Sequence, residues 1–340
     1  MSEARLETGI EPAAAVNGAE PAPRALRTAG IASIAAAVPA RAVPNSEIAG
    51  PLGIDDDWIA SRTGIRERRI AGEGETLVGL SSAAAAEALE RAGIEPTEID
   101  LVIVATFTPD DLQPHAAPLV AREIGATRAG ATDVGAACSG FLYGLSLASA
   151  QVESGRADAV VVVGADFATR VTDFTDKRTA GLFGDGTGAA VVTAGGPGSI
   201  GPLLLRADAG GAHFITATHE ERKLRMDGRQ TFRAAVAAMS EVTLEVAEAA
   251  GVALDEIDLF VYHQANGRIL SAVGERLDLP ADRVVDCIER YGNTSAATVP
   301  IALTEAAADG RLAPGTTVLL GAFGAGFTWA GAIIEWGGVA

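Results

Sequence analysis

The chain repeats itself, and this feature constrains its fold more than any other. Three segments recur in the same order: 92–104 with 250–262, 135–139 with 292–296, and 154–167 with 309–323. The first pair, AGIEPTEIDLVIV and AGVALDEIDLFVY, is identical at six of thirteen positions. The offset is 158 in this pair and 157 in the second. Such a repeat predicts two copies of one α/β unit of about 150 residues, related by a pseudo-twofold axis. A site between the copies would draw residues from both.

Apolar runs alternate with amphipathic stretches from Ile31 onward, which is the pattern of strands covered by helices. We therefore predict an α/β protein with an N-terminal half over residues 29–195 and a C-terminal half over residues 196–340. Residues 1–28 are rich in Ala, Pro, Glu and Gly and are predicted to be a mobile tail. The expected strands are 101–106, 159–164, 189–193, 259–262 and 317–321, and the expected helices are 80–92, 140–153 and 231–250.

The charge of the chain excludes several classes of partner. There are 26 Lys and Arg residues against 44 Asp and Glu, a net charge of −18. This balance argues against nucleic acid or an anionic membrane as the main partner. No apolar run reaches the ~18 residues of a membrane span, so we expect a soluble, cytoplasmic protein. Cys138 and Cys287 are the two cysteines, which argues against a disulfide framework.

Cys138 is the candidate nucleophile. It lies in Gly-Ala-Ala-Cys-Ser-Gly, directly before the helix expected over residues 140–153. A thiol at a helix N-terminus faces unpaired N–H groups and the positive end of the helix dipole, which favours the thiolate. The alternative is a small buried apolar side chain, which is what we expect of Cys287 within its apolar run. The strand-to-helix turn favours the reactive interpretation for Cys138.

His263 and Asn293 are the candidate partners of Cys138. His263 follows the strand expected over 259–262, at the edge of the sheet where α/β proteins bind ligands, although a capping role is the alternative. Asn293 belongs to a Gly-Asn pair, which by itself is typical of a turn. It precedes by two residues the position that the repeat aligns with Cys138, so the pseudo-twofold brings it near the thiol. Thiol proteases also use Cys, His and Asn, but here His263 and Asn293 both lie in the second copy of a duplicated unit.

Several separated motifs support a family resemblance. They are DWI at 57–59, RTGIRER at 62–68, GAACSGF at 135–141, FGDGTGAAV at 183–191, HQANGRI at 263–269, YGNTSAA at 291–297 and AFGAGFTW at 322–329. With these motifs the chain resembles the β-ketoacyl-acyl-carrier-protein synthase III family, condensing enzymes of the thiolase-like fold, from about Ile31 to its end. A degradative thiolase would carry a second reactive Cys in the loop 324–326, which has none. The resemblance implies a layered αβαβα fold and a homodimer.

The resemblance also implies a reaction. Cys138 would accept an acyl group from acyl-coenzyme A or an acyl carrier protein, and condensation with malonyl carrier protein would release CO2. His263 and Asn293 would donate hydrogen bonds to the malonyl thioester oxygen and stabilise the enolate. The backbone N–H groups of Cys138 and Ala325 would form the oxyanion hole. No metal or redox cofactor is expected, and the substrates are thioesters.

Binding residues follow from the same resemblance. Trp58, Arg62, Lys177 and Asn266 would contact coenzyme A or its pantetheine arm. A basic island on this acidic chain would be needed for the acidic acyl carrier protein, and Arg233 and Arg268 are expected to form it. Gln113 would lie at the end of the acyl pocket, where the family often has an apolar residue reaching across the dimer.

Two other functions stay open at this point. One is a ketosynthase III-like enzyme that primes or joins chains in polyketide biosynthesis. The other is an acyltransferase that passes the acyl group from Cys138 to an alcohol or amine without condensation. Asn293 argues against the second, because decarboxylation is the step that would need it.

Overall fold

Two β-sheets form the framework of the molecule, which the computed structural model describes over residues 27–196 and 198–339. The first sheet has the strand order β1-β7-β6-β4-β5 and the second β11-β12-β13-β8. All nine residues of β6 are buried, so both faces of this sheet are covered. The strands are β1 (Ala29–Ala37), β4 (Leu101–Ala105), β5 (Gly130–Val134), β6 (Ala159–Phe167), β7 (Asp185–Ala194), β8 (Gly198–Ala207), β11 (Leu259–Tyr262), β12 (Thr317–Gly324) and β13 (Thr328–Trp336).

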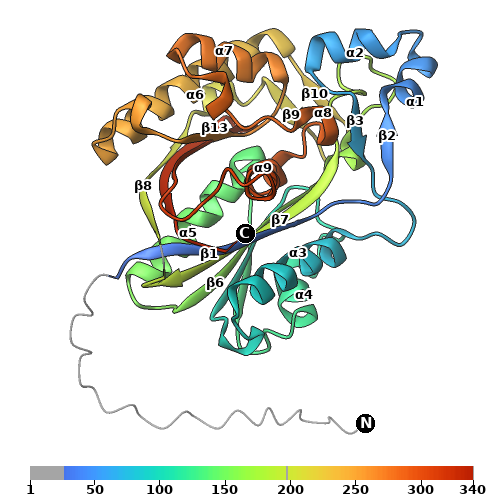
Figure 1. Ribbon diagram of the computed structural model, residues 1–340. Helices are drawn as coiled ribbons and strands as arrows, with labels where there is room; N and C mark the ends of the chain where they lie inside the picture. Colours follow the sequence, from blue (N-terminus) through green and yellow to red (C-terminus); the bar gives the residue numbers. More distant parts are fainter. Residues whose placement is uncertain (1–26, 197, 340) are drawn as a thin grey trace, which may run out of the picture.

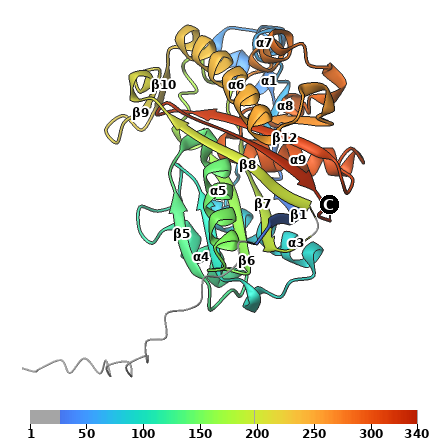
Figure 2. The ribbon, with the colours of Figure 1, turned by 90° about the vertical axis from the view of Figure 1, so that its left-hand side faces the viewer.

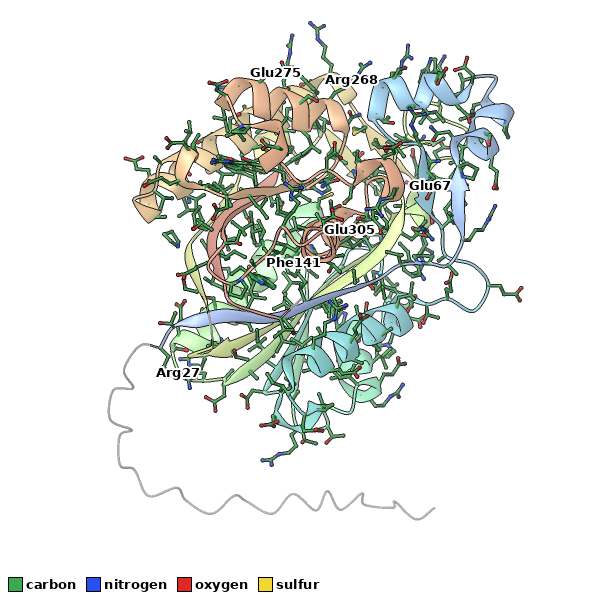
Figure 3. The ribbon with its side chains drawn as sticks, viewed as in Figure 1. Arg27, Glu67, Phe141, Arg268, Glu275 and Glu305 are labelled. Carbon is green, nitrogen blue, oxygen red and sulfur yellow. The ribbon has the colours of Figure 1, made fainter. Side chains whose placement is uncertain are left out.

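Helices cover the sheets and fill the space between them, which gives five layers (Figures 1 and 2). Two helices lie between the sheets, α5 (Gly140–Glu153) and α9 (Thr298–Ala308). The outer faces carry α3 (Leu77–Ala92) and α4 (Ala116–Glu123) on the first sheet, and α6 (Gly228–Ala250) and α7 (Gly267–Leu277) on the second. Phe141 of α5 is 1% exposed and lies in the middle of the molecule (Figure 3). The predicted αβαβα arrangement is confirmed.

The repeat appears as a constant offset of 158 residues between the halves. Leu101 of β4 pairs with Val160 of β6, and their counterparts Leu259 and Val318 pair in the second sheet. The short 3-10 turns before α5 and α9, Ala137–Ser139 and Ser295–Ala297, follow the same offset. Both turns begin at a non-glycine residue of positive φ, 46° at Ala137 and 53° at Ser295.

This offset corrects the alignment made from the sequence, which placed Ser295 opposite Cys138. The counterpart of Cys138 is Ala296, and Ser295 is the counterpart of Ala137. The second copy has one more residue between its glycine, Gly292, and the turn than the first copy has after Gly135. The division into halves at residue 195 remains our interpretation.

The segment between β1 and α3, residues 38–76, covers the edge where the halves meet. Arg68 within it is fully buried and donates hydrogen bonds to Val43 O, Asn45 Oδ1 and Gly181 O. Burial lowers the pKa of Arg68 to about 10. The remaining elements here and near the C-terminal half are β2 (Ala42–Pro44), α1 (Asn45–Ala49), α2 (Asp56–Thr63), β3 (Glu67–Arg69), β9 (Ile215–Ala217), β10 (Leu224–Met226) and α8 (Ile288–Tyr291).

Helix starts differ from the predicted ones because side-chain caps lie further upstream. The expected helices begin at Leu80 and Thr231, whereas α3 begins at Leu77 and α6 at Gly228. Thr76 accepts a hydrogen bond from Gly79 N, and Asp227 accepts hydrogen bonds from Arg229 N and Gln230 N in the first turn of α6. These caps satisfy N–H groups that the apolar periodicity does not report.

The predicted mobile tail lies mostly outside the described residues. Its last two residues, Arg27 and Thr28, contact the fold, and its end at residue 28 stays a prediction. Arg27 pairs with Asp158 and donates to Val152 O, and Thr28 O accepts from Gly195 N. None of the described helices is long and apolar enough to cross a membrane.

Candidate active site

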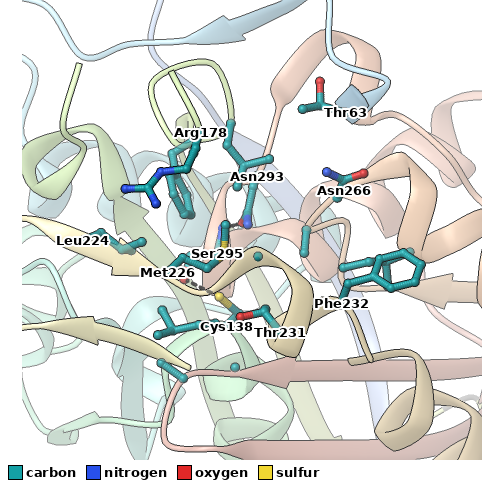
Figure 4. Close-up of a pocket in the computed structure, with 18 of the residues that line it drawn as sticks. Thr63, Cys138, Arg178, Leu224, Met226, Thr231, Phe232, Asn266, Asn293 and Ser295 are labelled. Carbon is teal, nitrogen blue, oxygen red and sulfur yellow. Dashed lines mark hydrogen bonds between the residues drawn. The ribbon is translucent and has the colours of Figure 1, made fainter. Parts of the chain in front are cut away.

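A cavity of about 810 Å³ opens where the two halves meet (Figure 4). The first half contributes Cys138 and Phe107 to its wall, and the second half contributes His263, Asn293 and Phe323. The predicted nucleophile and both of its predicted partners therefore line one cavity. They come from the 3-10 turn before α5, the end of β11 and the loop before α9.

Cys138 is held as a neutral thiol. Its residue is partly open to the cavity, but its Sγ lies among protein atoms and accepts a hydrogen bond from Ser295 Oγ at 3.3 Å. Burial raises the pKa of Cys138 to about 12, and the negative charge of Asp166 raises it further. The prediction that the helix N-terminus favours the thiolate is therefore wrong for the free protein. Burial outweighs it, and the thiol must lose a proton during the reaction.

His263 is a neutral imidazole facing the cavity. It is 1% exposed, and neither ring nitrogen has a hydrogen-bond partner among the described residues. Burial lowers the pKa of His263 to about 3. Its main chain is fixed by a 2.7 Å bond from its N to Gly321 O, and its ring packs edge-on against Phe323. One ring nitrogen can donate a hydrogen bond to a substrate oxygen without carrying a charge.

Asn293 is oriented by its own loop. Its Oδ1 accepts a hydrogen bond from Ser295 N at 2.9 Å, which leaves its amide N–H groups to donate elsewhere. Its backbone bonds to Leu182 O and to Gly184 N, which ties the loop to the first half. Gly184 is required there, because a Cβ would lie 2.3 Å from Tyr291 O. His263 and Asn293 thus both line the cavity with N–H groups that can donate to a substrate.

Gly324 leaves room beside the backbone of the nucleophile. A Cβ at Gly324 would come within 2.7 Å of Cys138 N and 3.1 Å of Ser139 N. Ala325, the next residue, lines the cavity. The expected oxyanion position beside Cys138 N and Ala325 N is therefore open only while residue 324 has no side chain.

We expect Gly324→Ala to slow acylation of Cys138 by about 10²-fold, the usual effect of losing an oxyanion donor. The φ of Gly324 lies outside the left-handed region, so the effect is steric and not conformational. Gly135→Ala is the matched control, because a Cβ there meets nothing within 4 Å. Single-turnover acylation followed by intact-protein mass spectrometry checks this. Equal rates in both variants would remove the oxyanion role from this loop.

The mouth of the cavity is basic, although the chain is strongly acidic. Its lining includes six cationic side chains and, among the described residues, no carboxylate. The guanidinium of Arg62 lies 4.3 Å from the centre of the Trp58 ring. Arg178 is paired with Asp176 behind it. The cationic residues are Arg62, Lys177, Arg178, Arg229, Arg233 and Arg268.

The predicted binding residues meet at this mouth. Trp58, Arg62, Lys177, Asn266, Arg233 and Arg268 all line the cavity. Asn266 caps α7 by accepting from Arg268 N, and Arg268 also donates to Ser61 O of α2. Arg268 lies at the surface of α7 (Figure 3). Sequence reasoning missed Arg229 and Phe232, whose positions in the first turn of α6 beside Arg233 could have indicated them.

Two residues singled out from the sequence lie elsewhere. Gln113 is exposed, bonds to the His115 ring and does not line the cavity of the single chain. Its role across a dimer stays a prediction. Cys287 is buried and does not line the cavity. Within residues 27–196 and 198–339, no group of three or more His, Cys, Asp or Glu side chains is arranged to hold a metal ion.

Two family models match the chain. The model described as 3-oxoacyl-[acyl-carrier-protein] synthase III matches residues 132–209, and the model of its C-terminal part matches residues 247–336. Among curated proteins, a beta-ketoacyl-[acyl-carrier-protein] synthase III of Brucella melitensis is 43% identical over 318 residues, which are 90% of this chain and 98% of that protein. The protein of the same name from Rhizorhabdus wittichii is 44% identical, over 92% of this chain and 100% of its own.

Solved structures give the same result. The 3-oxoacyl-[acyl-carrier-protein] synthase III of Aquifex aeolicus superposes with a TM-score of 0.88 at 40% identity, over 91% of this chain and 100% of its own. The priming beta-ketosynthase of the R1128 polyketide pathway superposes with a TM-score of 0.89 at 38% identity, over 93% of this chain and 99% of its own. By sequence and by structure, the chain belongs to the 3-oxoacyl-[acyl-carrier-protein] synthase III family of condensing acyltransferases, which have the thiolase-like fold.

Proposed function

We propose that Cys138, His263 and Asn293 carry out the two half-reactions of this condensing enzyme. The observation that carries the proposal is their convergence on one cavity from two halves of the chain. Cys138 takes the acyl group, and the other two side chains act on the malonyl thioester. The relatives named above support this assignment by their names and by their cover of nine-tenths of the chain or more.

In the first half-reaction the deprotonated Cys138 Sγ attacks the thioester carbonyl of the donor. The carbonyl oxygen becomes negative and accepts hydrogen bonds from the N–H groups of Cys138 and Ala325. The C–S bond to coenzyme A then breaks, and the released coenzyme A thiolate takes up the proton that Cys138 has lost. The product is an acyl thioester on Cys138.

In the second half-reaction the malonyl thioester loses CO2. The electron pair of the broken C–C bond moves into an enolate, whose oxygen accepts hydrogen bonds from His263 and Asn293. The nucleophilic carbon attacks the acyl carbonyl on Cys138, and the Cys138 thiolate leaves. A neutral His263 suits this step, because a hydrogen bond is required and a proton transfer is not.

The basic mouth supports thioesters that carry phosphate and a carrier protein that is acidic. Six cationic side chains line the cavity. Phe232, which lies between Arg229 and Arg233 in the sequence, is 37% exposed. Phosphate and carboxylate groups would both be attracted there. The acyl end of the substrate would reach the apolar part of the cavity, which includes Phe107, Leu182, Phe183, Ile215, Leu224 and Met226.

We also propose a cytoplasmic homodimer, with β5 in the interface. β5 is the edge strand of the first sheet and is partly exposed. Asp133 of β5 accepts hydrogen bonds from the start of α4, which places the preceding loop beside this edge. Leu112 in that loop is 76% exposed, and Gln113 is next to it. Pairing of two such edges would cover Leu112 and bring Gln113 toward the partner.

A priming ketosynthase of polyketide biosynthesis is the second candidate. It is favoured by the similarity to the R1128 enzyme, which is as high in TM-score as that to the Aquifex enzyme. Transfer of the acyl group to an alcohol or amine without condensation is the third. The three differ in the acyl group accepted and in whether CO2 is released.

The test incubates the protein with a panel of acyl-coenzyme A and acyl-carrier thioesters and reads the added mass on Cys138. Malonyl carrier protein is then added, and CO2 is measured. An adduct on Cys138 followed by CO2 and a β-ketoacyl carrier supports the condensing function. An adduct without CO2 would leave only the non-condensing acyltransferase.

The same assay tests the mouth. We expect Arg233→Glu to raise KM for malonyl carrier protein by about tenfold or more, the scale of one charge contact or ~1.4 kcal/mol. KM for acyl-coenzyme A should change less, because other cations of the mouth remain. Arg276→Glu on α7 is the control, since Arg276 is exposed but does not line the cavity. Equal effects of the two substitutions would show that only the overall charge matters.

A further inference from the structure

A buried carboxylate lies behind the nucleophile and has no part in the mechanism above. Asp166, near the end of β6, is 0% exposed. Its Oδ1 accepts hydrogen bonds from Thr106 Oγ1 at 3.1 Å, Phe107 N at 2.9 Å and Thr108 Oγ1 at 2.8 Å. Its Oδ2 accepts a hydrogen bond from Ala296 N at 3.2 Å. Asp166 thus joins a cavity-lining loop of the first half to the turn that precedes α9.

Ser295 connects this carboxylate to the thiol. Its hydroxyl donates to Cys138 Sγ at 3.3 Å, and the N–H of the next residue, Ala296, donates to Asp166 Oδ2 at 3.2 Å. The Ser295 hydroxyl is close enough to Asp166 to lower the pKa of that carboxyl. A hydroxyl has one proton, so Ser295 can donate either to the thiol or, after turning, to the carboxylate. Ser295 is 1% exposed and lies among the residues lining the cavity (Figure 4).

Few other charges reach Asp166. Strand alternation places Asp185 on the opposite face of the sheet, because it pairs with Phe167, the next residue. Arg170 lies over the Phe167 ring at 4.7 Å and donates to Thr108 O, not to Asp166. The titratable group that faces Asp166 from the 3-10 turn before α5 is Cys138 itself.

We propose that Asp166 accepts the Cys138 thiol proton through Ser295 when the thiol attacks a thioester, an inference that rests on Cys138 being the nucleophile. The S–H bond of Cys138 breaks and its proton passes to Ser295 Oγ. The Ser295 O–H proton passes to the Asp166 carboxylate. The products are a thiolate and a neutral carboxylic acid. The proton then returns from Asp166 to Ser295, which lines the cavity and passes a proton to the departing coenzyme A thiolate.

This route avoids creating new charge in a buried site. The network of Cys138, Ser295 and Asp166 has one negative charge before the transfer and one after it. Transfer to His263 would instead produce two charges from two neutral groups, and burial opposes both. Burial also raises the pKa of Asp166 to about 6, so its carboxylate is available above that pH and is a stronger base than an exposed one.

The proposal predicts an unusual response to Asp166→Asn. A negative neighbour disfavours a thiolate, so simple removal of the Asp166 charge would lower the pKa of Cys138 and speed its reactions. If Asp166 is the proton acceptor, the same substitution slows them. We expect acylation of Cys138 at pH 7.5 to fall about 10²-fold, the lower range for a general base.

The pH profile provides a second readout. In the wild type, acylation should be level above about pH 6 and fall below it, as the Asp166 carboxylate is protonated with its raised pKa. In Asp166→Asn the rate should keep rising with pH, because hydroxide must then remove the proton. Alkylation of Cys138 by iodoacetamide, located by peptide mass, measures the same thiolate without any thioester.

Two further variants separate a proton role from a structural one. Ser295→Ala breaks the route but leaves the backbone contacts of Asp166, and Ala is accepted at the equivalent Ala137 with a similar positive φ. Ser295→Ala should slow acylation of Cys138 as much as Asp166→Asn does. The variant that carries both substitutions should be no slower than either one alone. Asp185 is a buried carboxylate on the other face of the sheet that accepts three hydrogen bonds, and Asp185→Asn should acylate at the wild-type rate.

The outcomes are distinct. No acylation of the wild type at any pH would overturn the proposed nucleophile and not this inference alone. Normal wild-type acylation, with Asp166→Asn as fast or faster and of the same pH profile, would overturn the inference. Malonyl decarboxylation in a Cys138→Ala background should be unchanged by Asp166→Asn. An equal loss in that reaction would mean that Asp166 only maintains the shape of the site.

Discussion

Cys138→Ala is expected to give no acyl adduct with any donor, while decarboxylation of malonyl carrier protein continues. The first reaction needs the sulfur, and the second uses His263 and Asn293 of the other half. Intact-protein mass spectrometry measures the adduct, and CO2 release measures decarboxylation. The free energy of unfolding should change by only about 1 kcal/mol, because Cys138 is partly open to the cavity.

The second cysteine provides the control for this result. Cys287 is buried, and its backbone N–H donates a hydrogen bond to Gln264 Oε1 at 2.9 Å. Cys287→Ala should therefore keep the adduct. An adduct that persists in Cys138→Ala and disappears in Cys287→Ala would exchange the roles of the two thiols and refute the assignment.

His263→Ala should show the opposite division of effects. Acylation of Cys138 should persist, and condensation should fall by about 10²- to 10³-fold, as expected for one lost donor to a developing oxyanion. The same holds for Asn293→Ala. Because burial lowers the pKa of His263 to about 3, the imidazole stays neutral above that pH. Condensation from a preformed acyl-enzyme should thus show no titration of this histidine between pH 5 and 9.

Rapid-quench measurement of ketoacyl product from the isolated acyl-enzyme checks this prediction. His219→Ala is the control, since His219 is exposed and does not line the cavity. A loss of acylation in His263→Ala as large as the loss of condensation would make His263 the base of the first step. That result would also count against the route through Ser295.

The sequence was sufficient to predict the fold and to single out three side chains that line one cavity. The repeat predicts the two halves, and the strand-to-helix turn at Cys138 and the strand end at His263 are local patterns. Ser295 and Asp166 were missed because their contacts depend on how the halves meet. A one-residue error in the alignment of the repeat made Ser295 the counterpart of Cys138. In the structure Ser295 is the counterpart of Ala137, and its hydroxyl donates a hydrogen bond to Cys138 Sγ.

Burial is the other quantity that the sequence did not report. The helix N-terminus at Cys138 is visible in the sequence, whereas the atoms that surround the sulfur come from distant segments. The raised thiol pKa follows from these atoms. Gly324 illustrates the same limit. A side chain at this position would collide with Cys138 N, and only the structure shows that the two lie side by side. The predicted role of Gln113 at the acyl pocket depends on a second copy of the chain and stays a prediction.

The paired left-handed residues Ala137 and Ser295 give the two halves the same strained corner. A non-glycine residue in this conformation costs about 1–3 kcal/mol, yet both halves have one at the same place, and only one half carries the thiol. The conformation is therefore a property of the repeated unit and not of the nucleophile. One corner is followed by the thiol, and the other places a hydroxyl against that thiol. Two backbone corners of the same shape thus bring two different side chains into contact.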